Sequence, residues 1–324
     1  MRIRPATADL SHKEALEYVG MQKKHLILPL FVQERPEEEE LQIAMMPGIT
    51  KVPVDKVNQR IHAIVDAGIT SIIIFGIPRK TDERGSLASS ADGVVQQALR
   101  KIRKEYENQL NIITDVCLCQ YNTSGHCGLI NNNEVDNDLT LDSLSEIALS
   151  HAEAGADIVA PSSMMDGQVY SIRKMLKSHG FQKTKILSYS VKQLSSLYVP
   201  FRSAAFCKTS KFNVIDKSSY QVSYANSRQI LREIETDISE GADILMIKPG
   251  ITSLDIICMI KENFDFPIAT QNVSGEYAMI KAAAMHGWIS EEEWKVGSIA
   301  SIKRAGADMI ISYFSMDIAR YLDD

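Results

Sequence analysis

Apolar residues recur along the chain in short, nearly continuous runs that are rich in β-branched side chains. A run without alternation between apolar and polar positions is typical of a parallel strand that is buried on both faces. The pattern predicts eight such strands, at residues 26–32, 71–77, 111–119, 157–162, 185–190, 243–248, 267–273 and 308–314.

Helical patterns lie between these predicted strands. Apolar positions recur at helical spacing over residues 54–67, 141–154, 227–240 and 252–263. Four helices run into the next strand through similar short sequences, and we expect their glycines at helix C-termini: Gly68, Gly155, Gly241 and Gly306. Eight strands that alternate with helices, together with this repeated junction, favour a closed (β/α)8 TIM barrel of the α/β class over an open doubly wound sheet.

Three segments fall outside this repeat. Residues 1–25 precede the first strand and are interpreted as an N-terminal arm, which leaves 26–324 as the barrel and catalytic domain. The acidic stretch 34–40 is expected to be a solvated loop. Residues 191–223 separate a strand from its helix, and a loop of this length is usually a lid or a binding loop, so we predict an active-site lid there.

Charge and composition exclude several classes of function. The chain has 324 residues, a net charge of −6 and a pI near 5.7, so it has no basic footprint for nucleic acid or an anionic membrane. Apolar stretches long enough for a signal peptide or a membrane span are absent, which predicts a cytoplasmic protein. Glycine-rich nucleotide motifs are also absent.

Two lysines are the strongest candidates for chemistry. Active sites of barrels form where strands end, and Lys192 and Lys248 both stand at predicted strand ends. Burial at the end of an apolar strand lowers the pKa of a lysine and frees its amine to form a Schiff base with a ketone. A single such lysine would more often extend its ammonium to water. Two on one rim favour covalent chemistry.

Three cysteines form a second candidate site. Cys117, Cys119 and Cys127 lie close together in the chain, and three protein ligands with one open position are typical of a catalytic zinc. His126 is either a fourth ligand or a bystander. The alternative is a set of buried, inert thiols. A clustered set within an odd number of cysteines favours metal binding in a reducing compartment, and we expect Cys207 and Cys258 to be structural.

Several motifs together resemble one enzyme family over nearly the whole chain. They include ITDVCLCQY at 113–121, GHCG at 125–128, LSYSVK at 187–192, LMIKPG at 245–250 and VSGEYAM at 273–279. These sequences are similar to those of porphobilinogen synthase, also called 5-aminolevulinate dehydratase. The resemblance implies a lyase of heme biosynthesis that condenses two 5-aminolevulinate molecules to a pyrrole, with loss of two waters.

The resemblance also implies roles for particular residues. Lys192 and Lys248 would form the two Schiff bases, with Asp115 beside them, and Cys117, Cys119 and Cys127 would bind zinc. The expected substrate-binding residues are Phe201, Arg202, Lys217 and Gln221 in the lid, with Ser274 and Tyr313 for the other carboxylate. Glu233 corresponds to a position for an allosteric magnesium, and the assembly is expected to be a homo-octamer.

Some positions depart from the family pattern. Ser163 replaces an expected aspartate, Gln168 an arginine, Ser124 a histidine and Gln271 a tyrosine. Lys217 replaces an arginine, which keeps the charge but loses the bidentate fork. We expect these changes to cluster at the substrate and metal face. They motivate two alternatives, a paralogue that acts on another amino-ketone or keto acid and a catalytically silent homologue. A single-lysine aldolase would leave Lys192 and the cysteines unexplained.

Overall fold

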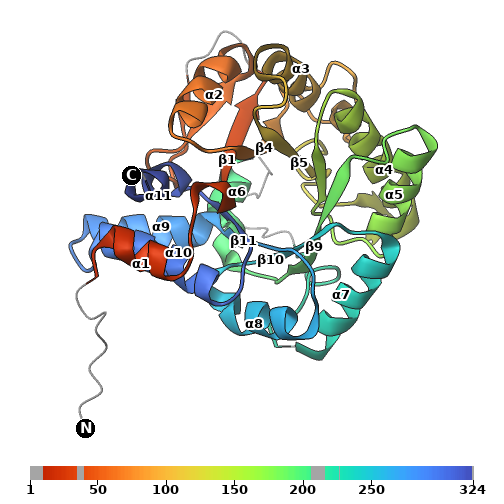
Figure 1. Ribbon diagram of the computed structural model, residues 1–324. Coiled ribbons are helices and arrows are strands. Elements are labelled where there is room, and N and C mark those ends of the chain that lie inside the picture. Colours follow the sequence, from red (N-terminus) through yellow and green to blue (C-terminus); the bar gives the residue numbers. More distant parts are fainter. Residues whose placement is uncertain (1–9, 35–39, 206–215, 226, 323–324) are drawn as a thin grey trace.

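The computed structural model describes residues 10–34, 40–205, 216–225 and 227–322, and its centre is a closed ring of parallel strands (Figure 1). The ring follows the order β1, β4, β5, β8, β9, β10, β11, β12, and β12 pairs in parallel with β1, which closes the barrel. The strands are β1 (Leu26–Gln33), β4 (Ser71–Ile77), β5 (Asn111–Val116), β8 (Ile158–Pro161), β9 (Lys185–Lys192), β10 (Ile244–Lys248), β11 (Ile268–Asn272) and β12 (Met309–Ser312).

All eight predicted strands are therefore confirmed, and so is the closed (β/α)8 barrel. Nearly every residue in them is buried, because side chains on one face fill the barrel and those on the other pack under the helices. The third predicted strand, at 111–119, was too long: β5 stops at Val116, and the chain turns over residues 118–121.

Helices surround the barrel (Figure 1). They are α1 (His12–Tyr18), α2 (Val57–Asp66), α3 (Val94–Tyr106), α4 (Asn137–Glu153), α5 (Gln168–Ser178), α6 (Val199–Ala204), α7 (Ser227–Glu240), α8 (Leu254–Asn263), α9 (Ser274–Met285), α10 (Glu291–Arg304) and α11 (Ser315–Tyr321). The four helices predicted from apolar spacing correspond to α2, α4, α7 and α8. None of the helices in the described ranges is long and apolar enough to cross a membrane.

The repeated junctions have a common physical basis. Their four glycines adopt positive φ angles between 76° and 117°, which residues with a Cβ rarely adopt. Three junctions continue with an aspartate whose carboxylate accepts a backbone N–H from the preceding strand: Asp157 from Ile112, Asp243 from Ile186 and Asp308 from Ile268. A helix cation pairs with each carboxylate: Arg103, Arg173 and Lys261. The repeat thus holds adjacent strands in register.

Short strands outside the barrel were not predicted. β2 (Leu41–Gln42) pairs antiparallel with β3 (Thr50–Pro53), and β6 (Leu129–Asn131) pairs with β7 (Glu134–Asp136). From the acidic stretch, Glu40 accepts hydrogen bonds from Thr50 and Arg60, so this end is bound rather than freely solvated. Of the expected arm, α1 packs against α10. The predicted lid includes α6, and its residues 206–215 lie outside the described part of the chain.

Candidate active site

A pocket lies where the barrel strands end, and it collects the predicted catalytic and substrate-binding residues. Asp115 lies near the end of β5, Lys192 ends β9 and Lys248 ends β10. The remaining lining residues are Phe75, Cys119, Cys127, Ser162, Tyr198, Phe201, Arg202, Lys217, Gln221, Gln271, Val273, Ser274 and Tyr313. The C-terminal strand ends therefore bring together residues that are far apart in sequence, as expected for a barrel enzyme.

Lys192 and Lys248 lie side by side in the pocket. Their Cα atoms are partners in the parallel pairing of β9 with β10, so both side chains start from the same level of the barrel. Lys192 is 7% exposed and Lys248 9% exposed. The Nζ atom of Lys248 donates a hydrogen bond to Oε1 of Gln271 at 3.2 Å and lies 4.5 Å from the ring centroid of Tyr189.

This environment disfavours a charged ammonium on Lys248. Burial, and then the neighbouring charge of Lys192, lower the pKa of Lys248 to about 7, although Asp115 and the nearby thiols act in the opposite direction. A large share of this lysine therefore carries a neutral amine near neutral pH. A neutral amine is the form that attacks a ketone.

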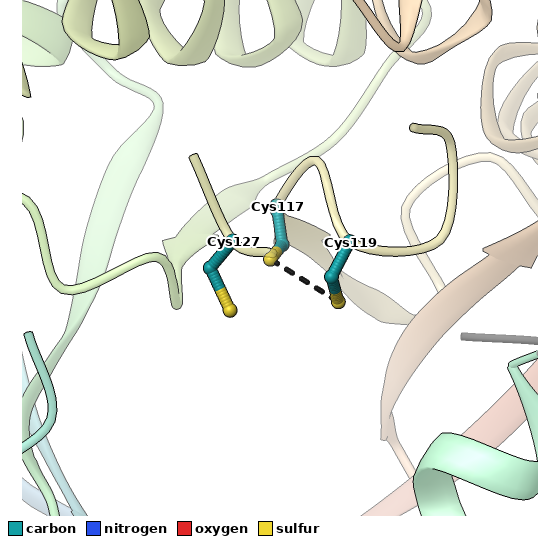
Figure 2. Close-up of side chains that lie close together, drawn as sticks. All are labelled: Cys117, Cys119 and Cys127. Atoms are coloured by element: carbon teal, nitrogen blue, oxygen red, sulfur yellow. Dashed lines mark hydrogen bonds between the residues drawn. The ribbon is translucent and has the colours of Figure 1, made fainter. Parts of the chain in front are cut away.

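The three predicted metal ligands meet in one buried cluster. Cys117, Cys119 and Cys127 have Sγ atoms that all lie within 4.8 Å of one another, and the first two are 3.5 Å apart. Figure 2 shows the three cysteine side chains pointing to the same side of the chain segments that carry them. Zn–S bonds of about 2.3 Å in a tetrahedral arrangement need sulfurs roughly 3.8 Å apart, so the spacing fits a metal ion.

Lysines face the cysteine cluster. Nζ of Lys217 lies 3.2 Å from Sγ of Cys127, and Nζ of Lys192 lies 3.9 Å from the same sulfur. Hydrogen bonds from Cys117 and Cys119, followed by the charges of the two lysines, hold the pKa of Cys127 well below its usual range. The cluster therefore favours a thiolate, which is the form of cysteine that binds metals.

The imidazole of His126 contacts Tyr220 rather than the cysteine cluster. Its Nδ1 lies 3.2 Å from the hydroxyl of Tyr220, which also accepts the backbone N–H of Cys127. In the part of the chain that the structure describes, the three cysteines are the one group of at least three such side chains close enough to share a metal ion. His126 therefore lies outside this group of three cysteines.

Asp115 is a buried acid beside the two lysines. Its Oδ2 atom accepts a hydrogen bond from Nε2 of Gln120 at 3.0 Å. Burial raises the pKa of this carboxyl group, while hydrogen bonds from Gln120 and Ser162 and the lysine charges oppose the change. Such an acid can exchange protons at the pocket wall.

The residues expected to bind carboxylates differ in whether their polar atoms already have hydrogen-bond partners within the protein. The Gln221 Oε1 atom and the Tyr313 hydroxyl are buried without a hydrogen-bond partner in the described protein. The Ser274 hydroxyl, in contrast, accepts the backbone N–H of Phe201 at 3.0 Å and donates to the carbonyl of Leu197 at 3.1 Å. Ser274 therefore also fastens α6 over the pocket.

The expected clustering of the departures is only partly correct. Lys217 and Gln271 line the pocket, and the Ser124 hydroxyl accepts the backbone N–H of His126 in the loop before Cys127. Ser163 and Gln168 do not line it. Gln168 accepts the backbone N–H of Met165 and donates to the carbonyl of Pro161, so it stabilises the turn into α5.

Two other residues named from the sequence lie away from the pocket, and a third falls outside the residues that the structure describes. Glu233 is on α7, where it accepts a hydrogen bond from Gln229 and lines a separate cavity together with Asp166. Cys258 is exposed on α8, and Cys207 falls outside the described residues.

The sequence interpretation missed several pocket residues. Phe75 and Tyr198 line the pocket, Tyr189 contacts Lys248, and Gln120 contacts Asp115. Tyr189 lies within a predicted strand, three positions before Lys192, where an aromatic residue is ordinary core. Its position beside a buried lysine becomes visible only in the structure, where β9 pairs with β10.

The fold and the site together define the class of protein. A closed (β/α)8 barrel with two buried lysines and a cluster of three cysteines at its C-terminal end has the fold of a barrel enzyme and side chains that can form Schiff bases and bind a metal ion.

Comparison with known proteins identifies the family. Residues 1–321 match the family model for delta-aminolevulinic acid dehydratase. The delta-aminolevulinic acid dehydratase of Archaeoglobus fulgidus is 47% identical over 99% of this chain and 97% of the relative, and that of Staphylococcus epidermidis is 44% identical over 96% and 95%. The chain belongs to the delta-aminolevulinic acid dehydratase family and is a lyase of the 5-aminolevulinate dehydratase type.

A solved structure agrees with this assignment. The porphobilinogen synthase of Toxoplasma gondii ME49, determined with its product porphobilinogen, aligns with a TM-score of 0.89 at 34% identity. The alignment covers 99% of this chain and 92% of that structure.

Proposed function

We propose that this chain condenses two molecules of 5-aminolevulinate to porphobilinogen, with loss of two waters, through Schiff bases on Lys192 and Lys248. The observation that carries the proposal is the pairing of these two buried lysines in one pocket, with the pKa of Lys248 lowered to about 7. A reaction that joins two ketone substrates can use one amine for each of them.

Each lysine would act by the same chemistry. The neutral amine attacks the ketone carbon of a substrate and forms a carbinolamine. The hydroxyl then leaves as water after accepting a proton, and the nitrogen becomes a protonated iminium. Lys192 would be oriented for this attack by the hydrogen bond from its Nζ to the carbonyl of Ser162. The iminium draws electrons from the adjacent carbon, which makes a proton there easier to remove.

Asp115 would move protons in these steps. Its carboxyl group lines the pocket, and burial raises its pKa, so it can hold a proton for the departing hydroxyl and later accept one from carbon. The hydrogen bond from Gln120 would fix the orientation of the carboxyl group.

Cys117, Cys119 and Cys127 would hold a zinc ion, because their sulfur spacing and the thiolate favoured at Cys127 suit a soft tetrahedral metal. When bound, zinc supplies a Lewis acid at the edge of the pocket. Glu233 would offer one carboxylate oxygen to a magnesium ion, in the cavity that Asp166 also lines.

The substrate carboxylates would be held at two places. Arg202, Lys217 and Gln221 would bind one carboxylate from the lid, with Phe201 packed beside them. Ser274 and Tyr313 would bind the other. The unpartnered Gln221 Oε1 and Tyr313 hydroxyl support this assignment for the two residues, because buried polar atoms without partners are rare and are expected to contact a ligand or water.

The protein would work as a homo-octamer. Exposed apolar side chains gather on the segment from α9 to α10: Met279, Met285, Trp288 and Trp294. Apolar surface of this kind marks interfaces. Sedimentation velocity tests the assembly directly, and a monomer at micromolar concentration would contradict it.

Turnover of 5-aminolevulinate by the purified protein tests the function. We expect a pyrrole product, detected colorimetrically, that disappears after chelation and returns with added zinc. Borohydride should trap substrate on Lys192 or Lys248, as peptide mass spectrometry would show, and Lys248→Ala should abolish turnover with an unchanged circular dichroism spectrum. A folded, zinc-loaded wild type without product would refute the proposal.

A further inference from the structure

Gln271 reaches the reacting nitrogen of Lys248 from the neighbouring strand. β11, which carries Gln271, pairs with β10, which ends at Lys248, and Ile247 is opposite Thr270. The side chain of Gln271 is 3% exposed and lines the pocket. Its Oε1 atom accepts the hydrogen bond from Nζ of Lys248 at 3.2 Å. The amide thus touches the atom that would become the Schiff-base nitrogen.

Two aromatic rings also lie close to this nitrogen. Nζ lies 4.5 Å from the ring centroid of Tyr189 and 5.1 Å from that of Tyr198. Within the described chain, Gln271 supplies the hydrogen-bond acceptor recorded for Nζ. The direction of the nitrogen lone pair therefore depends on Gln271.

We propose that Gln271 orients the Lys248 amine for attack and then holds the charged iminium through the same hydrogen bond. This inference rests on the proposed Schiff-base function. In the amine, one N–H donates to Gln271, which leaves the lone pair directed into the pocket. After water has left, the iminium keeps a single N–H and carries a positive charge. The hydrogen bond becomes charge-assisted, and such bonds are stronger than neutral ones.

The amide is suited to both states because it accepts a hydrogen bond without carrying a charge. A carboxylate at this position would pair with an ammonium and would keep Lys248 protonated, which removes the nucleophile. The other charged or titratable groups that act on Lys248 are Lys192, Asp115, Cys117 and Cys127. Variants at position 271 leave all of these in place.

Two variants separate orientation from simple packing. Gln271→Met keeps the length of the side chain and removes the acceptor, whereas Gln271→Glu keeps the acceptor and adds a charge. The first measurement is reductive methylation of Lys248 by formaldehyde and cyanoborohydride, followed by peptide mass spectrometry between pH 5 and 10. It reports the free amine without any need for 5-aminolevulinate. We expect the pH midpoint to fall in the Met variant and to rise by at least about one unit in the Glu variant.

Turnover provides the second measurement. The Met variant should lose about 10-fold to 100-fold in kcat, with KM changed less than about threefold, because the lost bond acts mainly on the charged iminium. Gln193→Met is the matched control, since this buried glutamine directly after β9 accepts a hydrogen bond from Ser253 instead. It should leave the methylation midpoint within about 0.5 pH unit of wild type and kcat within about threefold.

The outcomes distinguish this inference from the proposed function. Methylation midpoints that stay unchanged in both variants, or wild-type kcat in the Met variant, would overturn the role of Gln271. Absence of porphobilinogen formation by the wild type would instead overturn the proposed function. Midpoints that move in opposite directions, with the expected loss of kcat, would establish Gln271 as the residue that controls the Lys248 amine.

Discussion

Replacing Lys248 with methionine should make the folded protein more stable at neutral pH. A lysine in the unfolded chain titrates near 10.5, whereas Lys248 in the folded protein titrates at about 7. Between these values the unfolded chain binds a proton that the folded protein does not bind. The free energy of unfolding of the wild type therefore falls as the pH falls from 10.5 toward 7.

The size of this effect follows from the two pKa values. Each tenfold change in proton affinity corresponds to about 1.4 kcal/mol, so the buried amine costs the folded state about 4 kcal/mol at pH 7 and about 1 kcal/mol at pH 9.5. Lys248→Met removes this cost. Its stability advantage over wild type should shrink by roughly 3 kcal/mol between the two pH values, whatever constant amount the methionine adds by packing.

Equilibrium urea unfolding, followed by circular dichroism at one protein concentration, measures the difference at pH 7 and at pH 9.5. The same substitution at the exposed Lys183 controls for the loss of a positive charge. An advantage that does not change with pH would refute the reasoning, because it would mean that Lys248 keeps its proton in the folded state. A less stable variant at pH 7 would refute it as well.

Three further predictions concern activity and metal binding. Cys119→Ser should lower the zinc content measured by plasma mass spectrometry to well below one ion per chain, whereas Cys258→Ser, at an exposed thiol, should leave it unchanged. The kcat/KM of the wild type should fall tenfold per pH unit below about 7, as Lys248 becomes protonated, and a profile that is flat down to pH 5 would exclude that assignment. Tyr313→Phe should raise KM about fivefold to tenfold, because it removes one hydrogen bond worth about 1 kcal/mol to a substrate carboxylate, and an unchanged KM would argue against the contact.

The fold was predictable because its signals are local. Continuous apolar runs indicate strands that are buried on both faces, and the repeated glycine junction indicates the return to the next strand. The pairing of β12 with β1, which closes the barrel, joins the two ends of the chain, and no local pattern encodes it. The β2–β3 and β6–β7 hairpins were missed for the opposite reason. Most of their residues are exposed or only partly buried, so they leave no apolar period to detect.

The reactive residues of the site were predictable from the sequence, but the residues that contact and orient them were not. Lysines at strand ends and clustered cysteines differ from ordinary core residues, so the sequence marks them out. Tyr189 does not, because an aromatic ring within a strand is usually packing, and Gln271 differed only as a departure from the family pattern. Their contacts with Lys248 depend on the pairing of β9, β10 and β11 and on how far each side chain reaches.

The pocket gathers several buried, positively charged side chains. Lys192, Arg202, Lys217 and Lys248 all line it and are each at least nine-tenths buried, whereas Asp115 is the one carboxylate among the lining residues. Gathering several cations in one buried site is unfavourable, because like charges repel one another and burial removes their hydration. Although the chain has a net charge of −6, positive side chains are concentrated in this pocket, where the Cys127 thiolate balances part of their charge. Two substrate carboxylates would balance more of this positive charge. Binding an anionic ligand would therefore relieve the repulsion among the pocket cations, which favours such ligands.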